Sequence, residues 1–170
     1  PQERIRYTEN VGNVDYDKLG FLVEFYDNLP DVFLWGKTNL FKFISKEEFD
    51  TVKDNKVFTP LLTMEHRVYK DGRGVVCYYA DGIYYERNDN WFLNEVPAHH
   101  FSTWNEWARE FQITTPLYIP FAPGGNYILT RDTIHKYSRD HYQKMRDLMG
   151  YTQLPGEAQC AERSYFLMWK

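Results

Sequence analysis

The sequence predicts an α/β domain, in which helices pack against a sheet. Apolar residues recur at helical spacing over residues 15–28 and again over residues 131–149. A short, continuous apolar run at residues 32–35, closed by Gly36, is typical of a strand buried on both faces. Residues 67–86 contain three strand-like runs separated by turn dipeptides. Helices that alternate with strands of this kind favour the α/β class.

The first helix is expected over residues 15–28. Leu19, Leu22 and Tyr26 recur at three and four residues, which places them on one helical face. The dipeptide that ends at Pro30 stops this helix, because proline cannot continue it. The apolar run that follows is the first predicted strand.

Two capping boxes mark the starts of further helices. Ser45 with Glu48, and Thr103 with Glu106, have the spacing at which a side-chain oxygen and a carboxylate satisfy the free amides of a first turn. The first of these helices is expected to reach about Asp54.

The region between the two capping boxes is rich in strand-forming residues. Strands are expected at residues 67–70, 75–80 and 83–86. Asp71-Gly72 and Asp81-Gly82 separate them, and Asp-Gly is a strong signal for a tight hairpin turn. A β-meander is therefore predicted here.

In the C-terminal half, strands at residues 117–121 and 126–130 flank a turn at residues 122–125. Two consecutive glycines in this turn allow the backbone to approach whatever lies above it. One long amphipathic helix is expected at residues 131–149, and a final helix at residues 157–169.

Composition narrows the possible partners. The 170 residues carry 20 Lys plus Arg against 24 Asp plus Glu, a net charge of -4, without a basic block, so no nucleic-acid partner is expected. The longest apolar runs fall far short of a membrane span, so no transmembrane segment is expected. Two cysteines without paired spacing, Cys77 and Cys160, favour a reducing compartment, hence a cytoplasmic location, and core positions. The chain has no repeat or linker, so residues 1–170 are expected to form one domain.

Common catalytic and metal-binding motifs are absent from the sequence. Asp15 and Asp17 form an Asp-x-Asp pair that could chelate a divalent cation, but the pair opens a helix, where acids cap amides and complement the dipole. His99 and His100 are adjacent, so they point apart in a regular element. There is no G-x-S-x-G, P-loop or G-x-G-x-x-G. No cofactor is expected, with a divalent cation as the less favoured alternative.

Aromatic residues make up 18% of the chain, and many lie beside polar groups. An aromatic face next to a hydrogen-bonding side chain suits sugar rings. Trp35, Trp91, Trp104 and the tyrosine pairs therefore favour carbohydrate binding, although tyrosine-rich strands explain many of the tyrosines equally well.

Residues 123–131 and 154–157 combine the groups that sugar transfer needs. The first segment contains a glycine turn, a strand and the cation of Arg131, and the second places Glu157 at a helix start. An acceptor hydroxyl needs a carboxylate base, and a leaving diphosphate needs cations or helix amides.

Several segments also resemble a largely uncharacterised glycosyltransferase-like family of bacteria, plants and fungi. These are residues 9–12, 19–36, 124–131 and 162–165, with Trp169. The resemblance implies a GT-A-like fold, a mixed sheet flanked by helices of the nucleotide-diphospho-sugar transferase type. Members begin with a further strand and helix, so it also implies that an N-terminal strand is missing and that the chain is a fragment.

The resemblance implies transfer of a sugar, with inversion, from a nucleotide-sugar donor to a hydroxyl of a glycan acceptor. In the wider GT-A-like group an acidic metal motif follows a central strand, whereas here Gly36 to Asn39 follow with no acid. The mucin-core branching N-acetylglucosaminyltransferases, which resemble this arrangement, neutralise diphosphate with basic side chains instead of a metal. Metal-independent chemistry is therefore expected. The expected substrate-binding residues are Trp35, Lys37, Gly124, Gly125, Asn126 and Arg131, with a solvated loop lysine as the alternative for Lys37.

Two glutamates are candidates for the catalytic base. Glu157 and Glu162 are five residues apart, so on one helix they point about 140° apart and cannot both face one site. Glu157 is preferred because it lies at the loop-to-helix junction, where a substrate could reach it. Glu162 is expected to form an ion pair that orients the motif, although the family resemblance runs through it more clearly. A non-catalytic carbohydrate-binding domain is the alternative function.

Overall fold

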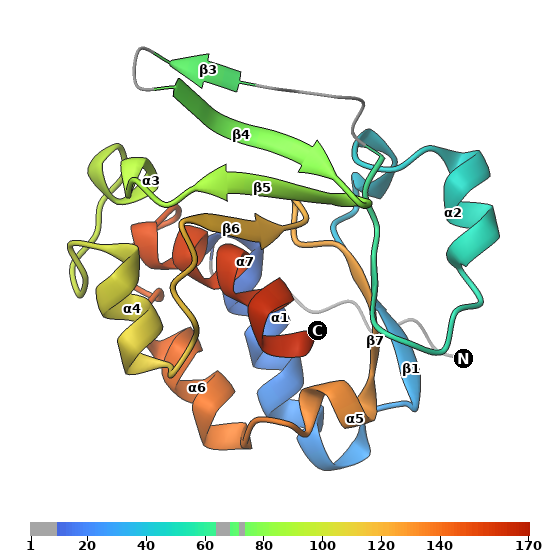
Figure 1. Cartoon of the computed structure of the whole chain (residues 1–170). Helices are drawn as coiled ribbons and strands as arrows, with labels where there is room; N and C mark the ends of the chain where they lie inside the picture. The colour runs from blue at the N-terminus through green and yellow to red at the C-terminus, as the bar shows by residue number, and fades with distance from the viewer. Residues whose placement is uncertain (1–9, 64–68, 72–73) are drawn as a thin grey trace.

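The computed structural model describes residues 10–63, 69–71 and 74–170 (Figure 1). The described chain is α/β, with two small antiparallel sheets and helices packed around them. The predicted class is confirmed. The expected single mixed sheet is not what these residues form, because every described pair of strands is antiparallel.

The smaller sheet has the strand order β1-β7-β2. It contains β1 (Val32–Trp35), β7 (Tyr127–Thr130) and β2 (Thr59–Pro60). β1 runs antiparallel to β7 along its whole length, with Val32 opposite Thr130. β1 lies where it was predicted, but the expectation that both faces are buried is wrong, since Leu34 is 53% exposed. Side chains of a strand point to its two faces, so Leu34 lies on a face of β1 that is open to solvent.

The larger sheet has the order β3-β4-β5-β6. It contains β3 (Tyr69–Asp71), β4 (Gly74–Ala80), β5 (Ile83–Arg87) and β6 (Tyr118–Phe121). The predicted hairpin between β4 and β5 is confirmed, because Asp81 and Gly82 both have positive φ, 51° and 74°, as the twisted two-residue turn requires. Residues 67 and 68 of the predicted preceding strand and Gly72 of its turn lie outside the described residues.

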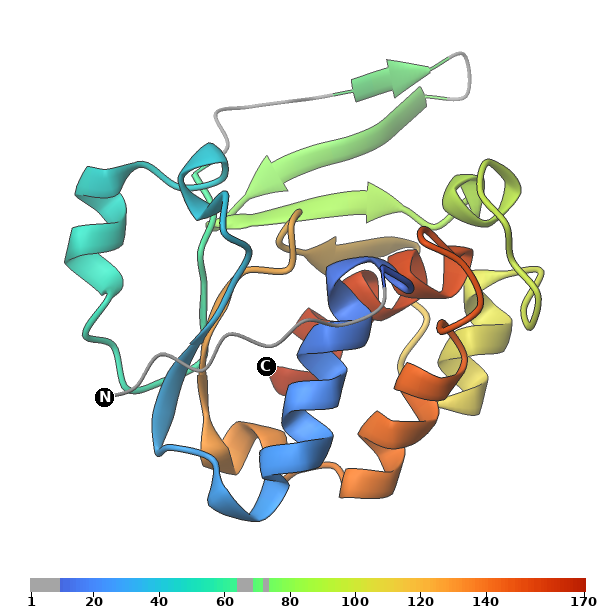
Figure 2. The same ribbon diagram turned by 180° about the vertical axis from the view of Figure 1, so that it is seen from behind.

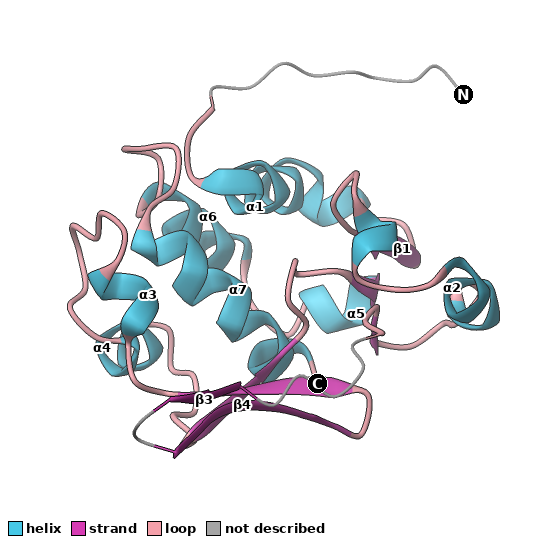
Figure 3. Ribbon diagram, turned by 90° about the horizontal axis from the view of Figure 1, so that it is seen from above, coloured by secondary structure: helices cyan, strands magenta, loops and turns pink. Residues whose placement is uncertain are grey.

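The helices gather on one face of the larger sheet. Figure 3 shows α7 between this sheet and the pair α1 and α6. The larger helices are α1 (Asn13–Phe25), α4 (Trp104–Glu110), α6 (Arg139–Asp147) and α7 (Gly156–Trp169). Shorter ones are α2 (Lys46–Val52), α3 (Trp91–Asn94) and α5 (Arg131–Ile134), with 3-10 turns at Tyr26–Asn28 and Leu40–Lys42.

Both predicted helix starts are confirmed, but only Thr103 with Glu106 forms a complete capping box, since the Ser45 amide donates to the Thr63 hydroxyl instead of Glu48. The Ser45 hydroxyl accepts a hydrogen bond from the Glu48 amide at 3.1 Å. The Thr103 hydroxyl accepts from the Glu106 amide at 3.2 Å, and the Glu106 carboxylate accepts from the Thr103 amide at 3.3 Å. The first and last helices are also confirmed, although α1 ends at Phe25 and tightens into a 3-10 turn.

The single long helix expected at residues 131–149 is wrong, because α5 ends at Ile134 and α6 begins at Arg139. The Ser138 hydroxyl caps α6 by accepting from the His141 amide at 3.2 Å. Ile134 and Met145 are both fully buried. Because the two helices cover one core, the apolar periodicity continues across the break and hides it.

Aromatic rings around α7 form the centre of the core. Tyr165 and Trp169 stack with centroids 4.6 Å apart, and Trp35 meets both rings edge-on. Cys77 and Cys160 are buried, as expected. No helix in the described part of the chain is long and apolar enough to cross a membrane.

Candidate functional site

The turn between β6 and β7 is a close backbone approach that only glycine permits. Gly124 and Gly125 have φ values of 89° and 60°. A Cβ atom on Gly124 would lie 2.8 Å from Cζ of Phe43 and 2.9 Å from Nδ2 of Asn126. The prediction that the two glycines form a tight turn is therefore confirmed.

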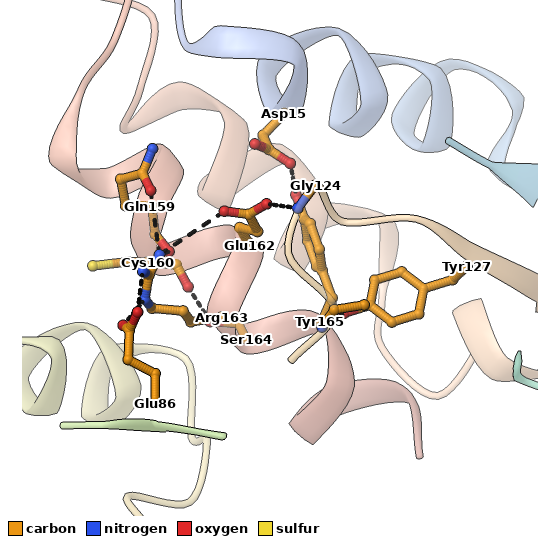
Figure 4. Close-up of polar contacts among 11 residues, drawn as sticks. Asp15, Glu86, Gly124, Tyr127, Gln159, Cys160, Glu162, Arg163, Ser164 and Tyr165 are labelled. Carbon is orange, nitrogen blue, oxygen red and sulfur yellow. Dashed lines mark hydrogen bonds and ion pairs between the residues drawn. The ribbon is translucent and has the colours of Figure 1, made fainter. Parts of the chain in front are cut away.

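Glu162 on α7 bonds to the backbone of this turn. Its Oε1 accepts a hydrogen bond from the Gly124 amide at 2.6 Å (Figure 4). Its Oε2 lies 3.9 Å from Nη1 of Arg163, which is too long for a hydrogen bond. Arg163 instead pairs with the buried Glu86 on β5, with Nε 2.7 Å from Oε1. The expected ion pair of Glu162 is thus present only as a long contact with Arg163, and its short contact is with the glycine turn.

Two charged residues of α1 lie beside this turn, Lys18 in contact with the turn and Asp15 in contact with Tyr165 on α7. Nζ of Lys18 donates to the Gly125 carbonyl at 2.6 Å. The Tyr165 hydroxyl donates to Oδ1 of Asp15 at 2.9 Å. Asp15 is only 2% exposed and Lys18 only 8%. Gly12 is the N-cap of α1, so the expectation that Asp15 caps the helix amides is wrong.

Burial shifts the pKa of both charged groups on α1. Burial raises the pKa of Asp15 from 3.8 to about 6; the charges of Lys18 and Lys37 oppose the shift, and that of Glu162 reinforces it. Burial likewise lowers the pKa of Lys18 from 10.5 to about 8, against the attraction of Asp15. All four charges therefore act on one another at this site.

The loop after β1 supplies the remaining polar groups. The Lys37 amide donates to Oδ1 of Asn126 at 2.8 Å, which fixes Oδ1 as the acceptor and turns Nδ2 away. Nδ2 of Asn126 and Nε1 of Trp35 are buried, and neither has a hydrogen-bond partner among the described residues. A buried donor without a partner is costly unless a ligand or a water satisfies it.

Six of the eight predicted site residues therefore converge. They are Trp35, Lys37, Gly124, Gly125, Asn126 and Glu162. Trp35 belongs to this set because its ring lies 5.3 Å from Nζ of Lys18. We call this set, together with Asp15, Lys18 and Tyr165, the glycine-turn site.

Arg131 does not belong to the glycine-turn site. It begins α5 at the far end of β7, roughly 13 Å away along the strand. Its Nε donates to the Leu29 carbonyl at 2.7 Å, and its Nη2 lies 3.0 Å from the Asp31 carboxylate. Arg131 thus ties α5 to the loop before β1, and its expected contact with substrate is not supported.

Glu157 is also separate, and the expectation that a substrate could reach it is wrong. Its side chain is completely buried. Its Oε1 accepts from the amides of His99 and His100 at 3.0 and 2.8 Å, and its Oε2 accepts from the Tyr151 hydroxyl. Both oxygens are occupied, so Glu157 anchors two loops to the start of α7.

Sequence reasoning missed Lys18 and Tyr165 and interpreted Asp15 only as a helix cap or a metal ligand. A signal was present, because Asp15 and Lys18 share the helical face of Leu19 and Leu22. Two opposite charges inside an apolar stripe indicate a buried polar cluster.

The described residues contain no group of three or more His, Cys, Asp or Glu side chains that could hold a metal ion. At the glycine-turn site, the carboxylates of Asp15 and Glu162 are accompanied by two ammonium groups. Comparisons with protein-family models, curated proteins and solved structures find no match to this chain.

Proposed function

We propose that the protein is a glycosyltransferase that moves a sugar from a nucleotide-sugar donor to a hydroxyl of a glycan acceptor, with inversion and without a bound metal. The observation that carries this proposal is the pair of buried, unpartnered donors, Nδ2 of Asn126 and Nε1 of Trp35, beside two lysines. Donors and cations together suit a ligand rich in anionic oxygens.

The lysines account for recognition of the donor diphosphate. Lys18 donates one of its three ammonium protons to the Gly125 carbonyl, and the other two can donate to a ligand. Lys37 is half-buried, and its backbone is fixed by Asn126. Cations at these positions stabilise the negative charge that collects on a leaving diphosphate.

Glu162 replaces Glu157 as the proposed base. Its side chain is 12% exposed. Its Oε2 lies 3.9 Å from Nη1 of the neighbouring Arg163, which is too far for a hydrogen bond. In a single displacement, the acceptor oxygen attacks the anomeric carbon and the bond to the diphosphate breaks. The electron pair leaves with the diphosphate, and the hydroxyl proton moves to Oε2 of Glu162.

The proposal includes the GT-A-like relationship. Segments that carry the resemblance meet although they are far apart in sequence. The Gly124 amide of the β6–β7 turn bonds to Glu162 on α7, and Trp35 at the end of β1 packs edge-on against Tyr165. The free edge of β1 pairs with no strand in the described part of the chain, so a further strand has room there.

The experiment measures transfer from a panel of nucleotide sugars to a panel of glycans, with Glu162→Gln and Glu157→Gln compared well below their melting temperatures. Glu162→Gln is expected to lose about 10²–10⁴-fold in turnover. Glu157→Gln is the matched control, and is expected to lose stability but keep its rate. Donor binding, measured by thermal shift, is expected to weaken in Lys37→Ala. The mechanism is contradicted if Glu162→Gln transfers sugar normally, or if Lys37→Ala binds the donor as tightly as the wild type.

The tyrosines of the larger sheet favour a second candidate, a non-catalytic carbohydrate-binding domain. Tyr78 and Tyr85 stack with centroids 4.9 Å apart, and Tyr118 lies edge-on at 5.3 Å from Tyr78. Trp35 and Trp104 are buried and cannot form an open platform. This candidate predicts that Tyr85→Ala abolishes glycan binding, whereas nucleotide sugars never shift the melting temperature.

A further inference from the structure

A pocket lies at the start of α1, on a different side of the helix from the glycine-turn site. Its volume is about 570 Å³. Figure 2 shows this part of α1 beside the loop that leads into α7. Among the described residues, the lining comes from these two segments: Asn10, Val11, Asn13, Val14, Asp17, Gln153 and Leu154.

The backbone fixes the walls of this pocket. The Gly12 amide donates to the Thr152 carbonyl at 2.7 Å, and the Asn13 amide donates to the Gln153 carbonyl at 2.8 Å. Gly12 and Asn13 have φ values of 63° and 55°, so two consecutive residues adopt the left-handed backbone conformation. A Cβ on Gly12 would lie 2.5 Å from Cβ of Tyr16, which excludes any other residue there. The pocket is therefore formed before a ligand arrives.

The described part of the lining is neutral apart from one acid. Asn10, Asn13 and Gln153 offer amide groups, each of which both donates and accepts hydrogen bonds, and Asp17 adds an acceptor. Val11, Val14 and Leu154, the other lining residues, offer aliphatic surface. The described lining residues include no cation, so a phosphate or carboxylate ligand is disfavoured. Sugar hydroxyls match this mixture, because each of them also donates and accepts.

The pocket and the glycine-turn site are close neighbours. Val14 lines the pocket and Asp15, the next residue, belongs to the glycine-turn site, so their Cα atoms are about 3.8 Å apart. The two sites therefore lie on two sides of one helix of about 10 Å diameter. Asp15 is only 2% exposed, so the helix itself separates the two sites.

We propose that this pocket binds an uncharged sugar residue of the glycan acceptor. The inference rests on the proposed glycosyltransferase function. It divides the ligands by charge: the anionic diphosphate meets the lysines of the glycine-turn site, and the neutral acceptor meets the amides of the pocket.

The test is titration of the full chain with three neutral trisaccharides, maltotriose, cellotriose and triacetylchitotriose, and with anionic trigalacturonic acid. The side-chain amide signals of Asn10, Asn13 and Gln153 are followed by ¹H–¹⁵N NMR. At least one neutral trisaccharide is expected to shift these signals, and trigalacturonic acid is expected to leave them unchanged. The Asn10→Ala/Gln153→Ala double variant is expected to weaken that binding about tenfold, because two hydrogen bonds are lost. Both side chains are exposed, so the variant keeps the fold.

Lys37→Ala is the matched control, expected to leave trisaccharide binding within about twofold while it weakens binding of a nucleoside diphosphate. The inference is overturned if no neutral trisaccharide shifts the three amides, if trigalacturonic acid binds equally well, or if the shifts map to Tyr78 and Tyr85. Neutral binding at the pocket without any nucleotide binding would leave a glycan site but refute the transferase. Nucleotide binding without glycan at the pocket would refute only the acceptor site.

Discussion

Replacing Asp15 with asparagine is expected to stabilise the protein increasingly as pH rises from acid to neutral. Asparagine has nearly the same shape and keeps an oxygen that can accept from the Tyr165 hydroxyl. It lacks the negative charge, whose burial raises the pKa of Asp15 from 3.8 to about 6. The substitution therefore removes one ionisation from the glycine-turn site and little else.

The sign and size follow from the shift in pKa. Between the two values, the folded protein holds a proton on Asp15 that the unfolded chain has released, so the free energy of unfolding falls as pH rises. The difference of about two pKa units corresponds to about 3 kcal/mol. Between about pH 4 and pH 6.5, about 2 kcal/mol of this is lost by the wild type and not by the variant.

The assay is urea unfolding of both proteins across that range, which lies below the pKa of about 8 at which Lys18 releases its proton. The difference in unfolding free energy between Asp15→Asn and the wild type is expected to grow by about 2 kcal/mol. Asp17→Asn is the matched control, because Asp17 is exposed on the same turn. A difference that does not change with pH, or that shrinks as pH rises, would refute the buried, ionisable Asp15.

Three further predictions concern the turn, the core and the chemistry. Gly124→Ala is expected to lose about 1–3 kcal/mol in urea unfolding, more than Gly82→Ala, whose added Cβ meets nothing within 4 Å; equal losses would contradict the close approach at Gly124. Arg163→Met leaves Glu86 buried and unpaired and is expected to cost about 3–5 kcal/mol, part of which Glu86→Gln in the same chain restores; a double variant no more stable than the single one would contradict this. Transfer activity is expected to survive EDTA, because two ammonium groups can neutralise the diphosphate, and an absolute need for Mg²⁺ or Mn²⁺ would oppose this view.

Local signals predicted the elements well where one short segment decides the structure. The hydroxyls of Ser45 and Thr103 cap their helices by accepting from the backbone amides three residues along the chain, and Asp81-Gly82 forms its hairpin turn. The break in the predicted helix 131–149 was missed although Ser138 is itself a good cap. A repeating apolar pattern reports which face meets the core, and two helices can share that face.

The candidate site was harder to predict, because its contacts join residues far apart in sequence. Angular spacing separates Glu157 from Glu162 on α7, but it does not reveal which of the two faces the glycine turn. That depends on the Gly124 amide, which comes from another part of the chain and bonds to Glu162. Glu157 instead accepts from the loop amides of His99 and His100, so it faces away from the glycine turn.

The charges on the buried face of α1 connect the fold to the proposed function. Burying Asp15 and Lys18 opposes folding, since the surroundings shift both pKa values toward the neutral forms. Apolar side chains of similar volume would stabilise such a position at least as well. Packing therefore gives no reason for these two charges, whereas a ligand that contacts the Gly124–Gly125 turn does. Lys18 reaches the turn directly, and the negative charge of Asp15 favours the protonated lysine, which is the state that the proposed binding of a diphosphate requires.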